Sequence, residues 1–248
     1  MWLNLVEDMT FIAKSIRKND MNMLIVKIPH LLCWFCGVAT KARIDLDDLV
    51  WHYFPFVCPT CWQPVCVCGV EKKVAKLAAQ KDEVTLAAMR TKNAARQPRV
   101  LDDYVQMFSA IYGSHSDSAT LVDIYLHFSE EVGEVAHHIR EVEAASGAGG
   151  NPAGVIELAL RSELADVFSW VCKLCWRIDR NLQGFLPWAQ YHLPITTADL
   201  FQIRFSEIIY HEYEMGCPSC HSRPCLIDCR SWHERQGADS SGKLGTKE

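Results

Sequence analysis

Two pairs of carboxylates at helical spacing within apolar segments constrain this chain more than any other feature. Glu131 and Glu134 stand in S-E-E-V-G-E, and Glu163 and Asp166 stand in S-E-L-A-D. Residues three apart share one face of a helix, so each pair directs two oxygen ligands the same way. If the two segments pack antiparallel across the turn at 147–152, the four acids converge and need a cation to offset their repulsion. Oxygen ligands of this kind suit Mg²⁺ or Mn²⁺, which in turn bind phosphates.

The segments around these acids carry the apolar period of amphipathic helices. One apolar stripe follows residues 121–139, a second follows residues 160–174, and a third helix is expected from about Thr197 to Tyr213. No convincing strand alternation is found, so the sequence predicts an all-α protein. A solvated helix face is the alternative explanation for the acids. Glu163 and Asp166 argue against it, because they lie among apolar residues, and burying a carboxylate without a partner costs several kcal/mol, roughly.

Composition bounds the class of protein. The chain has 248 residues, 49% of them hydrophobic, which is enough for one large domain or two small ones. Its net charge of −5 gives no general attraction to nucleic acid or anionic membranes. The first 17 residues do not have the pattern of a signal peptide, and Lys27, Pro29 and His30 interrupt the most apolar run, Met23–Ala39. We therefore expect a cytoplasmic protein with no membrane partner, and a nucleic-acid partner is not favoured.

A cysteine motif occurs twice and predicts metal sites. Both copies read H-x5-C-P-[TS]-C-x4-C and end in a further cysteine, and twelve cysteines without a secretion signal point to metal ligands rather than disulfides. Such turns present thiolates to tetrahedral Zn²⁺, which we favour over an Fe–S cluster. His52 and His211 are alternative fourth ligands. The expected zinc ligands are Cys58, Cys61, Cys66 and Cys68 in the first motif and Cys217, Cys220, Cys225 and Cys229 in the second.

The helices before the two cysteine motifs can also be aligned, so we interpret the chain as a tandem duplication of one helical module. In this alignment the first copy has lost three of the four acids and has gained a lysine where a metal would bind, so we expect it to be catalytically silent. The alternative is chance, because amphipathic helices resemble one another. The aligned residues are Asp8 with Glu131, Phe11 with Glu134, Leu24 with Glu163, and Lys27 with Asp166.

The predicted organisation has four parts. Residues 1–70 form the degenerate copy with its zinc knuckle, and residues 101–230 form the catalytic copy with its own. Residues 71–100 are rich in Ala, Lys and Arg and predict an exposed basic helix that Pro98 stops. A nucleic-acid-binding stripe is the alternative for this linker. Residues 231–248 have the composition of a disordered tail.

The acid signature resembles that of a known enzyme family. E-V-G-E at 131–134 and E-L-A-D at 163–166, with their flanks S-E-E-V-G-E-V and E-L-A-D-V-F-S-W, are similar to the E-x2-E…E-x2-D signature of MazG-like all-α nucleoside triphosphate pyrophosphohydrolases. The resemblance covers about residues 101–181. It implies a four-helix bundle, usually completed by a second subunit, in which Mg²⁺ positions a water to convert a nucleoside triphosphate into a monophosphate and pyrophosphate. Such chemistry depends on charge neutralisation and positioning.

The resemblance also assigns roles to residues. Glu131, Glu134, Glu163 and Asp166 become the Mg²⁺ ligands, and Glu130 becomes a group that orients a ligand or the water. Family members often carry a lysine where this chain has His127. We therefore expect other cations of this chain to make the phosphate contact of that lysine, with His127 still among the substrate-binding residues. The other expected substrate-binding residues are Trp170, Lys173 and Arg177, with Arg140 as a further cation.

Two points about partners remain open in the sequence. The silent copy could complete the bundle within one chain, or the protein could form a homodimer. In the first arrangement Trp34 or Phe35 could line the base pocket.

A second hypothesis for function is a zinc-stabilised module that binds nucleotides or nucleic acid without turnover, because His127 departs from the signature and the first site is lost. Metal-dependent release of pyrophosphate would separate an enzyme from such a module.

Overall fold

A computed structural model describes residues 2–68, 83–116, 118–147 and 154–179 of the chain. Every regular element in these ranges is a helix, which confirms the predicted all-α class. The expected helix at 197–213, the second cysteine motif with His211, and the tail at 231–248 lie outside the described residues.

The first two helices form an antiparallel hairpin. Helix α1 (Trp2–Lys18) ends at Asn19, whose positive φ of 53° reverses the chain, and α2 (Met21–Lys41) follows. Asp20 caps α2, since its side chain accepts a hydrogen bond from the backbone N–H of Met23 at 3.2 Å. Helix α2 has the length and apolar composition of a membrane span, as the core helices of many soluble proteins do. Half of that stretch is buried inside this molecule.

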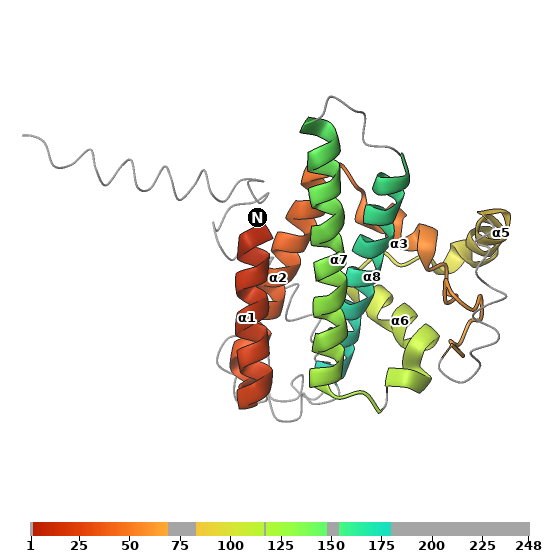
Figure 1. Cartoon of the computed structure of the whole chain (residues 1–248). Helices are drawn as coiled ribbons and strands as arrows, with labels where there is room; N and C mark the ends of the chain where they lie inside the picture. The colour runs from red at the N-terminus through yellow and green to blue at the C-terminus, as the bar shows by residue number, and fades with distance from the viewer. Residues whose placement is uncertain (1, 69–82, 117, 148–153, 180–248) are drawn as a thin grey trace, which may run out of the picture.

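A second antiparallel hairpin carries the acids. Helix α7 (Leu121–Gly147) begins after Thr120, which exchanges hydrogen bonds with Asp123 in a capping box, and α8 (Gly154–Asp179) runs back beside it. The four long helices α1, α2, α7 and α8 lie side by side (Figure 1).

The two hairpins share one continuous hydrophobic core. The rings of Phe35 on α2 and Phe168 on α8 stack with 6.4 Å between centroids, and the Tyr125 hydroxyl on α7 donates to the carbonyl of Met9 on α1 at 3.0 Å. The described parts of residues 1–70 and 101–230 therefore pack around a shared core.

Two shorter helices pack against the other side of α8. Helix α6 (Leu101–Ser116) places the rings of Tyr104 and Phe108 against Phe168, with centroids 5.3 and 6.4 Å away. Helix α3 (Leu46–Tyr53) contacts α8 as well, and the Tyr104 hydroxyl donates to Asp47 at 2.8 Å, which ties α6 to α3. Helix α3, which directly precedes the first cysteine motif, is thereby held beside the acid-bearing helix α8.

The linker contains the expected helix, but that helix is not freely solvated. Helix α5 (Glu83–Asn93) and the 3-10 turn Ala94–Arg96 end before Pro98, as predicted. Leu86 is buried, and the Asn93 side-chain amide donates to the carbonyl of Pro55 at 2.7 Å. Helix α5 therefore docks beside α3, which the basic and alanine-rich composition did not indicate.

Candidate functional site

Three of the four predicted acids meet between α7 and α8. Carboxylate oxygens of Glu131, Glu163 and Asp166 all lie within 4.8 Å of one another, and the three side chains are half-buried. The antiparallel packing of the two helices brings them together, as the spacing predicted. Glu134 is exposed and stands outside this group of three, but it is close enough to Glu163 to raise the pKa of that carboxyl. The described residues thus gather an all-oxygen donor set of the kind that suits Mg²⁺ or Mn²⁺.

The cluster is electrostatically strained without a cation. Burial, together with the neighbouring Glu134 and Glu131 carboxylates, raises the pKa of Glu163 to about 7. Burial also raises the pKa of Glu131, against the opposing effect of a hydrogen bond from Trp170. Like charges this close disfavour full ionisation unless a cation neutralises them.

The pH dependence of stability should report this repulsion in protein free of Mg²⁺. Glu163 holds its proton more tightly in the folded chain than at its ordinary pKa of 4.5, so the stabilisation is complete below that value. It is lost as the pH rises through about 7. We expect the wild-type Tm to fall across this window relative to Glu163→Gln, and Mg²⁺ to restore it at pH 8 but not at pH 5. Thermal melts of both proteins would measure this, and parallel pH profiles would contradict it.

Trp170 contacts two of the other predicted substrate-binding residues, His127 and Lys173. Its indole Nε1 donates to Glu131 Oε1 at 3.3 Å, and the His127 ring stacks on the indole with 4.8 Å between centroids. The Lys173 ammonium lies 4.3 Å from the centroid of the same ring. Glu130 is exposed, and its carboxylate lies 3.5 Å from His127 Nδ1. An aromatic platform with a cation above it therefore adjoins the acid cluster.

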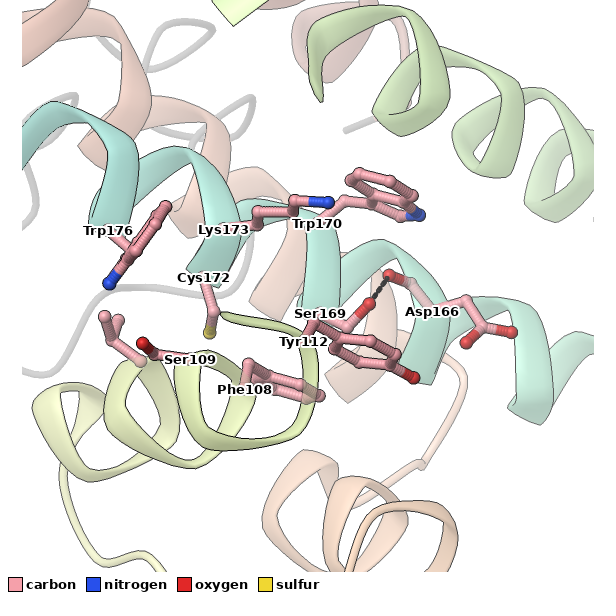
Figure 2. A pocket seen from close by; sticks show the side chains of 10 residues that line it. Phe108, Ser109, Tyr112, Asp166, Ser169, Trp170, Cys172, Lys173 and Trp176 are labelled. Carbon is pink, nitrogen blue, oxygen red and sulfur yellow. Dashed lines mark hydrogen bonds between the residues drawn. The ribbon is translucent and has the colours of Figure 1, made fainter. Parts of the chain in front are cut away.

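A pocket of about 140 Å³ opens between α6 and α8 beside this platform (Figure 2). Asp166 belongs both to its lining and to the acid cluster, and Lys173 lines it as well. The remaining lining is largely aromatic, with hydroxyl groups between the rings. These residues include Phe108, Ser109, Tyr112, Ser169, Trp170 and Trp176. A flat heterocycle bound here would lie next to the carboxylates.

Other predicted contacts fall outside the cluster. Arg177 stands three helical turns beyond Asp166, about 16 Å along the α8 axis, and Arg140 is about 9 Å beyond Glu134 on α7. Phe35 is buried in the core, and α2 supplies none of the residues that line the pocket, so the suggestion that Trp34 or Phe35 lines it is not supported.

Sequence reasoning missed two groups near the acids. Burial raises the pKa of Tyr53 at the end of α3, and the charges that act on it come from Arg161, Asp166 and Glu163 among others. Arg161 is thus a cation whose charge acts on Tyr53 together with those of two cluster acids. Arg161 precedes Glu163 by two residues, and residues two apart do not share a face of a helix. Tyr53 comes near the acids only because α3 packs on α8.

The first cysteine motif forms a cluster that can hold a metal. The sulfurs of Cys58, Cys61, Cys66 and Cys68 lie within 4.8 Å of one another, and Cys58 Sγ is 3.8 Å from Cys68 Sγ. A tetrahedral zinc site with Zn–S bonds of about 2.3 Å has an S···S edge of about 3.8 Å. Three of these cysteines are buried. Burial opposes the charge on Cys61, but backbone N–H groups of Val67 and Gln63 help to lower the pKa of this thiol.

The structure places His52 away from this cluster. Its Nδ1 lies 3.2 Å from Arg90 Nη1, and its Nε2 lies 3.5 Å from Glu83 Oε2, so both ring nitrogens are engaged with α5. The alternative of His52 as fourth ligand is therefore not favoured, and Cys68 occupies that position. The one-residue gap between Cys66 and Cys68 made His52 a candidate ligand in place of one of them, but the loop brings both sulfurs within 4.8 Å of the other two.

The first hairpin has an ion pair in place of an acid cluster. Lys27 Nζ on α2 lies 2.9 Å from Asp8 Oδ1 on α1, and the Asp8 side chain is only 7% exposed. The same ammonium lies 4.6 Å from the centroid of the Phe11 ring. Asp8, Phe11 and Lys27 are three of the four residues that the alignment pairs with acids of the second hairpin, and Lys27 contacts the other two.

Comparisons of the chain with protein-family models, curated proteins and solved structures found no match. Function is therefore inferred from the side chains themselves. The acid cluster with its aromatic pocket and the four-thiol cluster are the groups on which the proposed function rests.

Proposed function

We propose that this chain is a Mg²⁺- or Mn²⁺-dependent nucleoside triphosphate pyrophosphohydrolase of the MazG-like kind that its acid signature resembles. The observation that carries the proposal is the meeting of Glu131, Glu163 and Asp166 from two helices beside an aromatic pocket. Carboxylates in a site for phosphates need a bridging divalent cation, because they would otherwise repel the substrate.

The carboxylates fit such a cation. Glu131, Glu163 and Asp166 supply oxygen ligands, Glu134 supplies another from the exposed edge, and the raised pKa of Glu163 indicates a local excess of negative charge. A bound divalent cation neutralises phosphate charge and lowers the pKa of a water molecule. The Trp170 indole orients Glu131 through its hydrogen bond.

The aromatic groups and cations around the acids suit a nucleotide. A base inserted among the rings of the pocket would leave its phosphates near Asp166, which lines the pocket at the acid cluster. Lys173 lines the pocket, and the charge of Arg161 acts on Tyr53 together with those of Asp166 and Glu163. In this proposal the two cations contact phosphate oxygens in place of the lysine that family members carry at the position of His127. His127 instead extends the aromatic platform by stacking on Trp170.

The test is pyrophosphate release from a panel of ribo- and deoxynucleoside triphosphates with Mg²⁺, with Mn²⁺ and with neither. We expect turnover that requires a divalent cation and that produces pyrophosphate rather than inorganic phosphate. No turnover with any nucleotide, in folded and zinc-loaded protein, would overturn the enzyme proposal. Nucleotide binding without turnover would then favour the zinc-stabilised binding module.

The α1–α2 hairpin fits the role of a silent second copy. The Lys27 ammonium takes the place that the alignment gives to a metal ligand, so this hairpin carries its own cation. Its packing against α7 and α8 gives a bundle of four long helices within one chain. We propose that the chain thereby completes its own bundle, with a homodimer as the alternative assembly.

We further propose that Cys58, Cys61, Cys66 and Cys68 bind a structural Zn²⁺. Four thiolates close the coordination sphere, so no position is left for a substrate. The cluster instead joins helices, since the Cys66 N–H donates to the carbonyl of Ile111 on α6 at 2.7 Å. It also adjoins the pocket, because the Tyr112 hydroxyl lies 3.9 Å from Cys58 Sγ.

Replacing Cys58 with Ser should remove one equivalent of zinc and lower the Tm by about 10 °C or more, because structural zinc contributes directly to folding free energy. Zinc content by elemental analysis and thermal melts would measure both effects. Cys36→Ser, which changes an exposed cysteine on α2, is the control. An unchanged zinc content in Cys58→Ser would contradict the assignment.

A further inference from the structure

His137, His138 and Glu141 form another group of metal-ligating side chains on α7, apart from the acid and cysteine clusters. One donor atom from each lies within 4.8 Å of the other two. The Glu141 carboxylate joins the two imidazoles, with Oε2 2.9 Å from His138 Nδ1 and Oε1 3.4 Å from His137 Nε2. Helical spacing of three and four residues produces this arrangement, which brings three donors toward one point.

The donors differ in kind from those of the acid cluster. Two imidazoles and one carboxylate suit borderline transition-metal ions such as Zn²⁺, Co²⁺ or Ni²⁺, whereas Mg²⁺ prefers oxygen ligands.

The group is also partly fixed by its surroundings. His138 is only 20% exposed in its side chain, whereas His137 is 61% exposed, so one imidazole is held and the other remains open to solvent. His138 lies two helical turns beyond Glu131, about 10 Å along the α7 axis.

We propose that His137, His138 and Glu141 bind a transition-metal cation of the Zn²⁺ class, at a site separate from both the acid cluster and the four-thiol cluster. Three protein ligands leave further coordination positions for water or a small anion on the solvent side. The site does not depend on the proposed hydrolase activity, because none of its ligands belongs to the acid cluster. The simpler alternative is a pair of histidine–glutamate contacts on a helix surface.

The test uses the full-length chain without a histidine tag, loaded with zinc at its thiols, freed of excess metal and held in saturating Mg²⁺. Titration with Ni²⁺ in a calorimeter should show one additional equivalent. We expect His138→Ala and Glu141→Gln each to weaken this binding at least about tenfold. Loss of a group that only hydrogen-bonds a metal ligand already costs about 10–100-fold.

The matched control is His127→Ala. His127 and Glu130 form a histidine–glutamate pair on the same helix at 3.5 Å, but they belong to no group of three such ligands among the described residues. This variant should retain the additional equivalent. The proposal is overturned if wild type takes up no such equivalent, or if His127→Ala weakens binding as much as His138→Ala does while thermal melts show all variants folded.

Discussion

Asp166→Asn and Glu163→Gln should each lower the rate of pyrophosphate release at least about a hundredfold, because each removes a charge that the bound cation requires. The amides keep the shape of the acids, so the helix packing should survive. Removing one of several crowded carboxylates should leave the Tm of Mg²⁺-free protein unchanged or raise it, since burial and neighbouring acids already oppose the ionisation of Glu163. Activity and stability should therefore move in opposite directions.

Coupled pyrophosphate assays and thermal melts on the same preparations would measure the two effects. Glu143→Gln is the matched control, because Glu143 is an exposed acid on α7 outside the cluster. Calorimetric titration with Mn²⁺ adds a readout that does not depend on turnover, and both cluster variants should bind Mn²⁺ more weakly than wild type. Near-normal activity in either folded variant would contradict the assignment of these acids.

The part of this site that follows helical spacing was predictable from the sequence. Glu131 with Glu134, and Glu163 with Asp166, are set by a local rule, and a short connection between two long helices favours an antiparallel return. The same holds for the Cys58 and Cys61 pair, whose spacing alone brings two thiols together. In each case the ligating residues are close in sequence, so the local structure of one helix or one turn determines their geometry.

The rest of the site depends on packing between segments that are distant in sequence. Tyr53 approaches the acids only because α3 lies on α8, and the pocket exists only because α6 places Phe108 and Tyr112 opposite Trp170. His52 matched a zinc-ligand spacing, but the docking of α5 engages its ring with Arg90. Contacts of this kind have no sequence period, so the sequence pattern alone could not assign them.

The Lys27–Asp8 pair gives the second prediction with a large effect. Lys27→Met would leave Asp8 ionised and without its partner at a position where only 7% of its side chain is exposed. Removing one member of a buried ion pair costs about 3–5 kcal/mol, and the 20% exposure of Lys27 favours the lower end of that range. We therefore expect the Tm to fall by about 6–12 °C. Urea unfolding with and without the substitution would measure the free energy directly.

The double variant Asp8→Asn/Lys27→Met decides whether the loss comes from the unpaired charge. Removing both charges should recover most of the stability, because a buried ion pair contributes little beyond what it neutralises. Such recovery would mean that the first hairpin needs a cation only because it carries Asp8, which is the same role that we propose for a cation at Glu131, Glu163 and Asp166. Equal losses in the single and double variants would instead show that the Lys27 side chain acts through packing, including its contact with Phe11.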